Sequence, residues 1–197
     1  VEKSDYLGGH ASQWACMATN KCQYCGACLS HDLIREIEGV KNITLYKGCV
    51  AGSIQNLGEA YRVAIKGAID KELYVDAICL AAGLTPFDPA SLSSFEYRTK
   101  GVITTAELSR VIKNEALMDL LHNKPSPSIA FIQCVGSRNR ELGFDYCSQV
   151  CCKTSVRFAN RITSMIPEAS VTIFHMDLQT CGKMFRTQVA GLNRRIN

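Results

Sequence analysis

The clearest hydrophobic pattern lies in the last third of the chain. An uninterrupted apolar run over residues 129–135 predicts a buried strand. From Val150 to Ile166, apolar residues recur at spacings of three, four or six, and Pro167 then follows, so this pattern predicts a helix that ends before the proline. A second apolar run over residues 171–176 predicts another strand. A strand, a helix and a strand in this order predict a parallel pair joined by a right-handed crossover.

The pattern is less regular in the first half of the chain. Ser30 is placed to cap a short amphipathic helix, and the segments 42–46 and 61–65 read as short strands punctuated by glycines. Together they predict a small antiparallel meander. Residues 73–82 form a longer apolar run that predicts a strand, and Cys79 lies inside it, where a free cysteine is usually a core residue.

A capping box, Thr104 with Glu107, predicts the start of an amphipathic helix that continues to Leu121. The segment Lys124-Pro125-Ser126-Pro127 is the best candidate for a domain boundary. We therefore expect an α/β protein with two lobes, residues 1–124 and residues 125–197.

Cysteines gather where the C-terminal strand gives way to the helix. Cys134 lies near the strand end, Cys147 in the following loop, and Cys151 and Cys152 in the first helical turn, with Ser148 as the expected N-cap. A helix N-terminus offers free N–H groups and a positive dipole end, which suit thiolates and an anionic metal cluster. These four cysteines could therefore bind either an iron–sulfur cluster or a structural zinc ion.

A second group of cysteines follows the spacing Cys16-x5-Cys22-x2-Cys25-x2-Cys28. Three cysteines at x2 intervals can turn tightly around a cubane, and this favours iron–sulfur over zinc, whose ligands usually come as two separated pairs. The fourth ligand has two candidates, Cys16 and the more distant Cys49.

Two short segments resemble parts of a dinucleotide-binding fold. Glu2 ends a predicted strand, as does the acid that binds ribose in such folds, and Gly8 and Gly9 form a tight loop after it. The Ala82-Gly83 turn, with Pro86 after it, would let the backbone come close to a ligand. The glycine-rich pyrophosphate turn would lie before residue 1, and with Val rather than Met at that position we expect a piece of a longer protein.

Composition narrows the function further. The net charge is only +4, and no basic stripe with interleaved aromatics is present, so we expect no nucleic-acid partner. No apolar run reaches the length of a transmembrane helix, and no signal peptide is visible. Eleven cysteines without a secretory context indicate metal or redox sites in a reducing, cytoplasmic environment rather than disulfides.

Several motifs, in order along nearly the whole chain, resemble the flavoprotein A-subunit of heterodisulfide reductase and its bacterial relatives. They are VEK…GGH, AAGLTPFDP, GVITTAELSR, IAFIQCVGSR, YCSQVCC and VTIFHMDLQTCGK. The resemblance implies a thioredoxin-reductase-like, Rossmann-type FAD/NAD(P)-binding fold, N-terminally incomplete here. It also implies a [4Fe–4S] cluster bound by Cys134, Cys147, Cys151 and Cys152, with a second cluster at the N-terminal cysteines less firmly implied.

Function follows from the same resemblance. FAD, contacted through Glu2, Gly8, Gly9, Ala82 and Gly83, would exchange electrons with the clusters and with other subunits of a redox complex, such as iron–sulfur, hydrogenase-like or dehydrogenase-like proteins. A homodimer is also compatible with it. Two alternatives stay open: an NAD(P)H-dependent flavin disulfide oxidoreductase with redox-active thiols, and a zinc-stapled interaction module without enzymatic activity.

Overall fold

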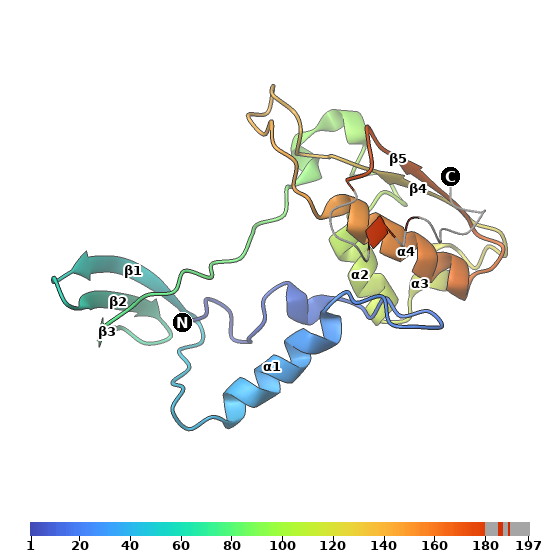
Figure 1. The fold of residues 1–197 in the computed structure, drawn as a ribbon. Helices are drawn as coiled ribbons and strands as arrows, with labels where there is room; N and C mark the ends of the chain where they lie inside the picture. The colour runs from blue at the N-terminus through green and yellow to red at the C-terminus, as the bar shows by residue number, and fades with distance from the viewer. Residues whose placement is uncertain (180–184, 187–188, 190–197) are drawn as a thin grey trace. The chain divides into compact units, whose positions relative to one another are not determined.

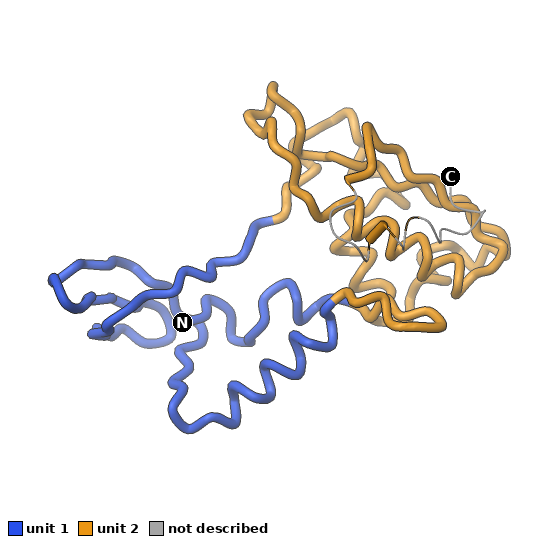
Figure 2. Tube along the Cα trace, viewed as in Figure 1, with its two compact units in different colours: residues 1–14, 26–85 blue, residues 15–25, 86–197 orange. Residues whose placement is uncertain are grey.

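The computed structural model describes residues 1–179, 185, 186 and 189. The chain forms two compact units (Figure 2): residues 1–14 with 26–85, and residues 15–25 with 86–197. These units are not the two lobes that we expected at 1–124 and 125–197, which stay a prediction about the nucleotide-binding-like halves of the protein.

The first unit contains one helix and one sheet (Figure 1). A 3-10 turn, η1 (Ala11–Gln13), precedes helix α1 (Ala27–Gly39), and strands β1 (Cys49–Asn56), β2 (Tyr61–Gly67) and β3 (Lys71–Val75) follow. The strands pair antiparallel in the order β1-β2-β3, with a register shift between Ala51 and Ser53. The expected antiparallel meander is therefore confirmed.

The limits of its elements were predicted less well. Residues 42–46 form no strand, whereas β1 was missed because seven of its eight side chains are exposed and leave no alternating pattern. The apolar run over 73–82 was expected to be one strand, but pairing with β2 ends at Val75. Helix α1 begins after Gly26, whose φ of +82° makes it the N-cap in place of Ser30.

The second unit packs helices against a parallel pair of strands. Its elements are η2 (Pro89–Ser91), η3 (Ser93–Phe95), α2 (Thr105–Lys113), α3 (Leu117–Leu120), β4 (Ser128–Ile132), α4 (Cys151–Met165) and β5 (Ser170–Phe174). Strands β4 and β5 pair parallel from Ser128↔Ser170 to Ile132↔Phe174, as the strand–helix–strand pattern predicts. The core lies between this pair and α4, where Phe131 stacks on Phe158 with ring centroids 6.3 Å apart.

Two helix predictions in this unit needed correction. The capping box is present, since Thr104 and Glu107 bond to each other's backbone N–H, but the helix that it opens is interrupted at residues 114–116. Glu115 adopts a φ of +58° there, which ends α2 and lets α3 start separately. Helix α4 matches its prediction, except that Val150, not Ser148, is the N-cap residue.

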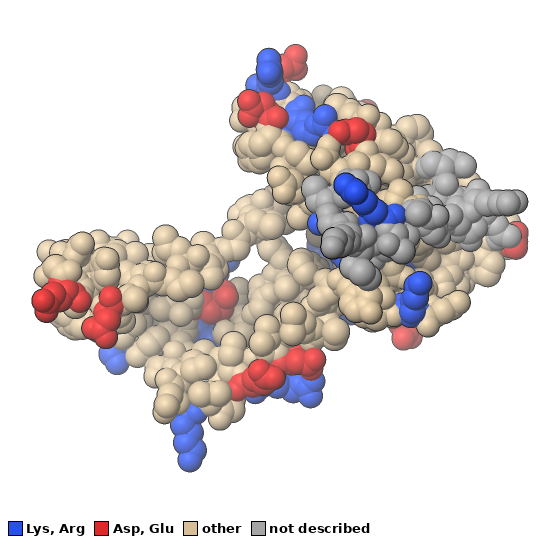
Figure 3. Space-filling model, in the orientation of Figure 1, with Lys and Arg blue, Asp and Glu red and all other residues tan. Residues whose placement is uncertain are grey.

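The described residues are thus mixed α/β, with one three-stranded antiparallel sheet and one two-stranded parallel sheet. The Rossmann-type FAD-binding arrangement remains a proposal. Basic and acidic side chains are interspersed on the face shown in Figure 3, and three ion pairs are formed among the described residues: Arg35–Asp32, Arg62–Glu72 and Arg138–Asp177. Within the described part of the chain, no helix has both the length and the apolar character that crossing a membrane requires.

Candidate metal centre

The C-terminal cysteines lie close in sequence to one end of the parallel pair. Cys134 follows the end of β4 by two residues, Asp177 follows the end of β5 by three, and Cys151 and Cys152 open α4. The carboxyl ends of parallel strands meet at the same edge, and the helix that connects them begins there. The βαβ topology therefore gathers these residues, although 43 positions separate the first from the last.

A short hairpin carries the chain from Cys134 to Cys147. The backbone N–H of Arg138 donates to the Tyr146 carbonyl at 3.0 Å, and Asn139 and Phe144 exchange two backbone bonds of 2.8 and 3.0 Å. The two arms run antiparallel, so the hairpin starts and ends at the same place. It closes the gap between Cys134 and Cys147 and makes them neighbours.

Aromatic packing holds the base of this hairpin. Gly136 has a φ of +73°, and a Cβ atom built on it would lie 2.1 Å from the Phe87 ring, so the ring rests directly on the glycine backbone. Phe87 also meets Phe144 edge-on, with centroids 6.2 Å apart, and Phe144 meets Tyr146 in the same way at 6.1 Å. Only glycine allows both the left-handed turn and this contact.

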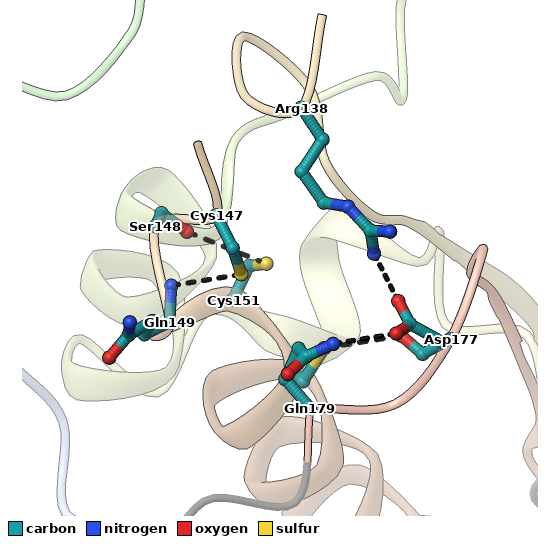
Figure 4. A network of polar contacts seen from close by, with 8 residues as sticks. Arg138, Cys147, Ser148, Gln149, Cys151, Asp177 and Gln179 are labelled. Carbon is teal, nitrogen blue, oxygen red and sulfur yellow. Dashed lines mark hydrogen bonds and ion pairs between the residues drawn. The ribbon is translucent and has the colours of Figure 1, made fainter. Parts of the chain in front are cut away.

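Polar groups already contact three of the thiols (Figure 4). The Gln149 backbone N–H donates to Cys147 Sγ at 3.3 Å, and the Ser148 hydroxyl donates to Cys151 Sγ at 3.7 Å. The Cys152 thiol lies 3.9 Å from the Asp177 carbonyl oxygen. Ser148 therefore serves a cysteine sulfur rather than the helix backbone, which explains why it is not the N-cap.

An ion pair links the hairpin to the segment after β5. The Arg138 guanidinium donates to the Asp177 carboxylate, which also accepts a bond of 2.6 Å from the Gln179 side chain. The Asp177 carboxylate raises the pKa of Arg138, and the nearby Cys134 raises it further by a smaller amount. A positive charge is thus kept beside the first cysteine of the group.

Electrostatic effects link several of the thiols to one another. Burial raises the pKa of Cys134, and the charges of Cys151 and Cys147 raise it further, against the lowering effect of Arg138. Burial likewise raises the pKa of Cys152, opposed by a backbone bond from Gln179 and reinforced by Cys151 and Cys134. Nonetheless, no three His, Cys, Asp or Glu side chains among the described residues stand ready as a complete metal-ion site.

The donor set fits an iron–sulfur cluster. All four cysteines are free thiols, the Gln149 N–H donates to one of them, and two of them open α4, whose first turn leaves backbone N–H groups without helical partners. Thiolates on a bound cluster would place their negative charge where the helix dipole and Arg138 favour it.

The N-terminal cysteines have a different setting. Cys16, Cys22 and Cys25 belong to the second unit, whereas Cys28 lies in α1 of the first. Cys16, Cys22 and Cys28 are exposed. Cys49, the alternative fourth ligand, is buried in the first unit with its sulfur 3.4 Å from the Lys47 carbonyl oxygen.

Two arginines of α4 hold the segment that carries Cys16, Cys22 and Cys25. Arg161 donates to the Ala18 carbonyl at 2.7 Å and Arg157 to the Tyr24 carbonyl at 3.1 Å. At the start of the segment, the Ala15 N–H donates to Ser109 Oγ of α2 at 2.9 Å. The segment is therefore anchored by backbone contacts to the same helix that opens with Cys151 and Cys152.

The residues expected to contact FAD all lie in the first unit. Glu2 forms a parallel bridge with Lys47, and its carboxylate accepts a bond of 2.9 Å from the Ser4 N–H. Gly8 and Gly9 have φ values of +91° and +47°, so the predicted tight loop is present. Ala82 and Gly83 are exposed and lie outside the helices and strands.

The sequence analysis did not predict the hairpin between Cys134 and Cys147 or the contacts that hold it in place. Asn139 and Gly143 are turn-forming residues that could have indicated the hairpin, and Gly136 a left-handed turn. The pairing of Arg138 with Asp177 and the contact of Phe87 with Gly136 join positions 39 and 49 residues apart. Nothing in the local pattern marks such contacts.

Fold and site define this protein as a mixed α/β chain with a candidate four-cysteine metal centre. Its sequence is related to the A-subunits of heterodisulfide reductases, so the resemblance seen in its motifs is confirmed. The chain is 38% identical over 120 residues to the A-subunit of the H(2):CoB-CoM heterodisulfide,ferredoxin reductase of Methanothermobacter thermautotrophicus. This match covers 58% of the chain but only 18% of the relative.

Two further relatives agree. The chain is 36% identical over 115 residues to an iron–sulfur A-subunit (form 2) of the CoB--CoM heterodisulfide reductase of Methanopyrus kandleri, covering 55% of the chain and 18% of that protein. It is 30% identical over 133 residues to the A-subunit of the ferredoxin/F(420)H(2)-dependent CoB-CoM heterodisulfide reductase of Methanosarcina acetivorans, covering 62% and 17%. No protein-family model matches the chain.

Proposed function

We propose that this chain is an electron-transfer segment of a protein resembling the A-subunit of heterodisulfide reductase, in which Cys134, Cys147, Cys151 and Cys152 bind a [4Fe–4S] cluster. The observation that carries the proposal is the topology: Cys134 follows the end of β4, a paired hairpin leads from it to Cys147, and Cys151 and Cys152 open α4 at the same edge. The name of the Methanopyrus relative, an iron–sulfur subunit, supports this choice of metal group.

The chain's own residues would hold and tune the centre. Cys134 and Cys147 would supply ligands from the two ends of the hairpin, and Cys151 and Cys152 from the helix. The Gln149 N–H already donates to Cys147 Sγ and would offset part of the negative charge of a bound thiolate. A cluster bound there would supply one-electron chemistry.

A second cluster at Cys22, Cys25 and Cys28, with Cys16 as the fourth ligand, is part of the proposal. The burial of Cys49 among the strands of the first unit favours Cys16 over it as the fourth ligand. Exposure of Cys16 and Cys22 leaves their thiols accessible to metal.

We place FAD at the first unit, with contacts from Glu2, Gly8, Gly9, Ala82 and Gly83. The positive φ values of the three glycines among them support close backbone approach to a ligand. Electrons would pass between the flavin, the clusters and partner subunits, since the names of the relatives describe subunits of reductase complexes. Adding upstream residues that supply a pyrophosphate turn should strengthen FAD binding, and an extended protein that binds no flavin would contradict this part.

A nicotinamide site in the second unit has less support. Directly after the strand the chain reads Cys134-Val135-Gly136-Ser137-Arg138, with one glycine and a thiol, and a hairpin follows where a glycine-rich phosphate turn would be needed. Arg138, which could otherwise pair with a phosphate, is engaged by Asp177. We therefore expect electrons to arrive through clusters and partner proteins rather than from NADH or NADPH bound here.

Metal analysis of the anaerobically purified chain tests the proposal. We expect iron and acid-labile sulfide in equal amounts, a broad visible absorption that bleaches with dithionite, and an EPR signal of the reduced cluster. Cys151→Ser should lower iron and sulfide together, whereas Cys79→Ser, which alters an exposed thiol outside both cysteine groups, should not. Stoichiometric zinc in a colourless protein would instead support the zinc-stapled module.

A further inference from the structure

A buried side-chain amide next to the candidate centre has no hydrogen-bond partner. Gln133 directly precedes Cys134, and its side chain is buried, since only 8% of the residue's surface is exposed. Among the residues that the structure describes, its Nε2 atom is one of three buried side-chain nitrogen atoms without a partner; the others belong to Arg157 and Arg161. Leaving a buried donor unpaired destabilises the folded state, so such a group needs an explanation.

The direction of the Gln133 side chain follows from the strand. Its backbone N–H continues the parallel ladder by donating to the Phe174 carbonyl at 3.0 Å. Side chains alternate between the faces of a strand, so Gln133 shares a face with Phe131 while Ile132 points the other way. Phe131 stacks on Phe158 of α4, and this face is therefore the one that the helix covers.

The position of Gln133 along β4 then determines which part of α4 lies nearest to its side-chain amide. Gln133 lies beyond the last paired residue of β4, at the carboxyl edge, and α4 begins at this same edge with Cys151 and Cys152. Cys152 is itself buried and contacts the Asp177 carbonyl in the segment after β5. Strand alternation thus puts the unpaired amide on the side of β4 that α4 covers, at the edge where the helix begins and directly before Cys134.

We propose that the Gln133 amide donates a hydrogen bond to a sulfur atom of the bound cluster, either a cysteine thiolate or an inorganic sulfide, and so raises the reduction potential of that cluster. The proposal rests on the proposed iron–sulfur function. A sulfur in a reduced cluster carries more negative charge than in an oxidised one, so a donated N–H stabilises the reduced form more. A dry, low-dielectric position strengthens this effect.

The test compares Gln133→Met with wild-type protein after cluster reconstitution in the full chain. Methionine has nearly the same length and shape but cannot donate. We expect unchanged iron and sulfide per chain and a midpoint potential, measured by EPR-monitored redox titration, that is more negative than in the wild type. Thr163→Val is the matched control: it removes a buried hydroxyl from the same core, where Thr163 Oγ1 bonds to the Ala159 carbonyl at 3.0 Å within α4.

An unchanged potential in Gln133→Met with full iron content would overturn the inference and leave the cluster assignment intact. Absence of iron from the wild-type chain would instead overturn the proposed function. If Gln133→Met does not assemble a cluster, protein that retains Gln133 and carries side-chain 15N-labelled glutamine decides the question by pulsed EPR. The label is placed in a Gln149→Met, Gln179→Met, Cys22→Ser background, which removes the neighbouring glutamine side chains and the proposed N-terminal cluster beside Gln23. A 15N coupling to the reduced cluster supports the bond, and its absence refutes it.

Discussion

The two groups of cysteines differ in how the fold supports them. Cys134, Cys147, Cys151 and Cys152 lie within one compact unit, on a strand end, a hairpin and a helix start that backbone pairing and aromatic contacts hold together. Cys16, Cys22 and Cys25 lie on a segment without regular structure, and the division between the compact units falls between Cys25 and Cys28. The elements that carry the first group are therefore fixed relative to one another within one unit, whereas the second group lies on an irregular segment held by a few contacts to α2 and α4.

The spacing of the cysteines in the sequence and the support that the fold gives them do not go together in this chain. The N-terminal group has the more familiar ligand spacing, yet the C-terminal group has the better scaffold, although its members are 4 to 13 residues apart or adjacent. A metal ion that binds to a preformed site has less chain to order, and more of its binding free energy appears as affinity. We therefore expect the C-terminal centre to be filled first and lost last.

The largest effect should come from removing one ligand of each group. Cys147→Ser should abolish the C-terminal cluster, and Cys22→Ser only the N-terminal one, so each should remove about half of the iron of a protein that carries two cubanes. The quantity to measure is iron and sulfide per chain, with Cys79→Ser as the control. If Cys22→Ser leaves the iron content unchanged, the N-terminal cysteines bind no cluster. The chain would then carry only the C-terminal centre.

A second test removes the preorganisation and leaves all four ligands in place. Gly136→Ala puts a side chain at a φ of +73° and into the Phe87 ring, which should destabilise the second unit by about 2–4 kcal/mol. Gly143→Ala is the matched control, since it has a φ of +74° but no atom within 4 Å of an added Cβ, and should cost about 1 kcal/mol.

Chemical unfolding and the rate of iron release to a chelator are the measurements for this pair. Gly136→Ala should accelerate release from the C-terminal centre, because the turn that places Cys134 is then strained. Equal effects of both substitutions would mean that the Phe87 contact does not support the centre.

A third test loosens the N-terminal group alone. Arg161→Met removes the bond to the Ala18 carbonyl but retains an apolar stem, and we expect a loss of about 1 kcal/mol in the anchoring of residues 15–25. Limited proteolysis within this segment should become faster while the C-terminal EPR signal is kept. Arg140→Met, at the hairpin tip, is the control, and equal proteolysis in both variants would show that Arg161 does not anchor the segment.

The smallest expected effect concerns α2, whose Ser109 accepts a hydrogen bond from the Ala15 N–H at the start of that segment. Burial alone would raise the pKa of Glu107, but hydrogen bonds from Thr104 and Tyr97, with the charge of Arg110, outweigh it and lower the pKa below its ordinary 4.5. A carboxyl group with a lowered pKa in the folded state stabilises it above pH 4.5, and this contribution is lost as the pH falls through the lowered value.

Glu107→Gln should therefore destabilise the cluster-free chain by about 1 kcal/mol at neutral pH and by less at acidic pH, as unfolding curves can show. Glu141→Gln, at the hairpin tip, serves as the control. A difference between wild type and Glu107→Gln that grows on acidification would contradict the argument.

The sequence predicted those features whose signal is local. The parallel pair, α4 and the capping box each follow from periodicity or from a four-residue motif, and the structure confirms them. Strand β1 was missed because its side chains are exposed, and the break at Glu115 because the apolar pattern continues across it. The four cysteines were recognisable as a group, but Gln133 became notable only when the covered face of β4 and the start of α4 showed what surrounds it.

The tip of the hairpin between Cys134 and Cys147 is not needed to bring these two cysteines together. Arm pairing ends at Asn139 and Phe144, and Arg140 and Glu141 lie beyond it. Because the arms, not the tip, bring the two cysteines together, extra residues at the tip would cost only loop entropy, about 0.6 kcal/mol for each doubling in length. A spectroscopic label or an affinity tag could be inserted there, within a few residues of the proposed metal centre, without changing the backbone that positions Cys134 and Cys147.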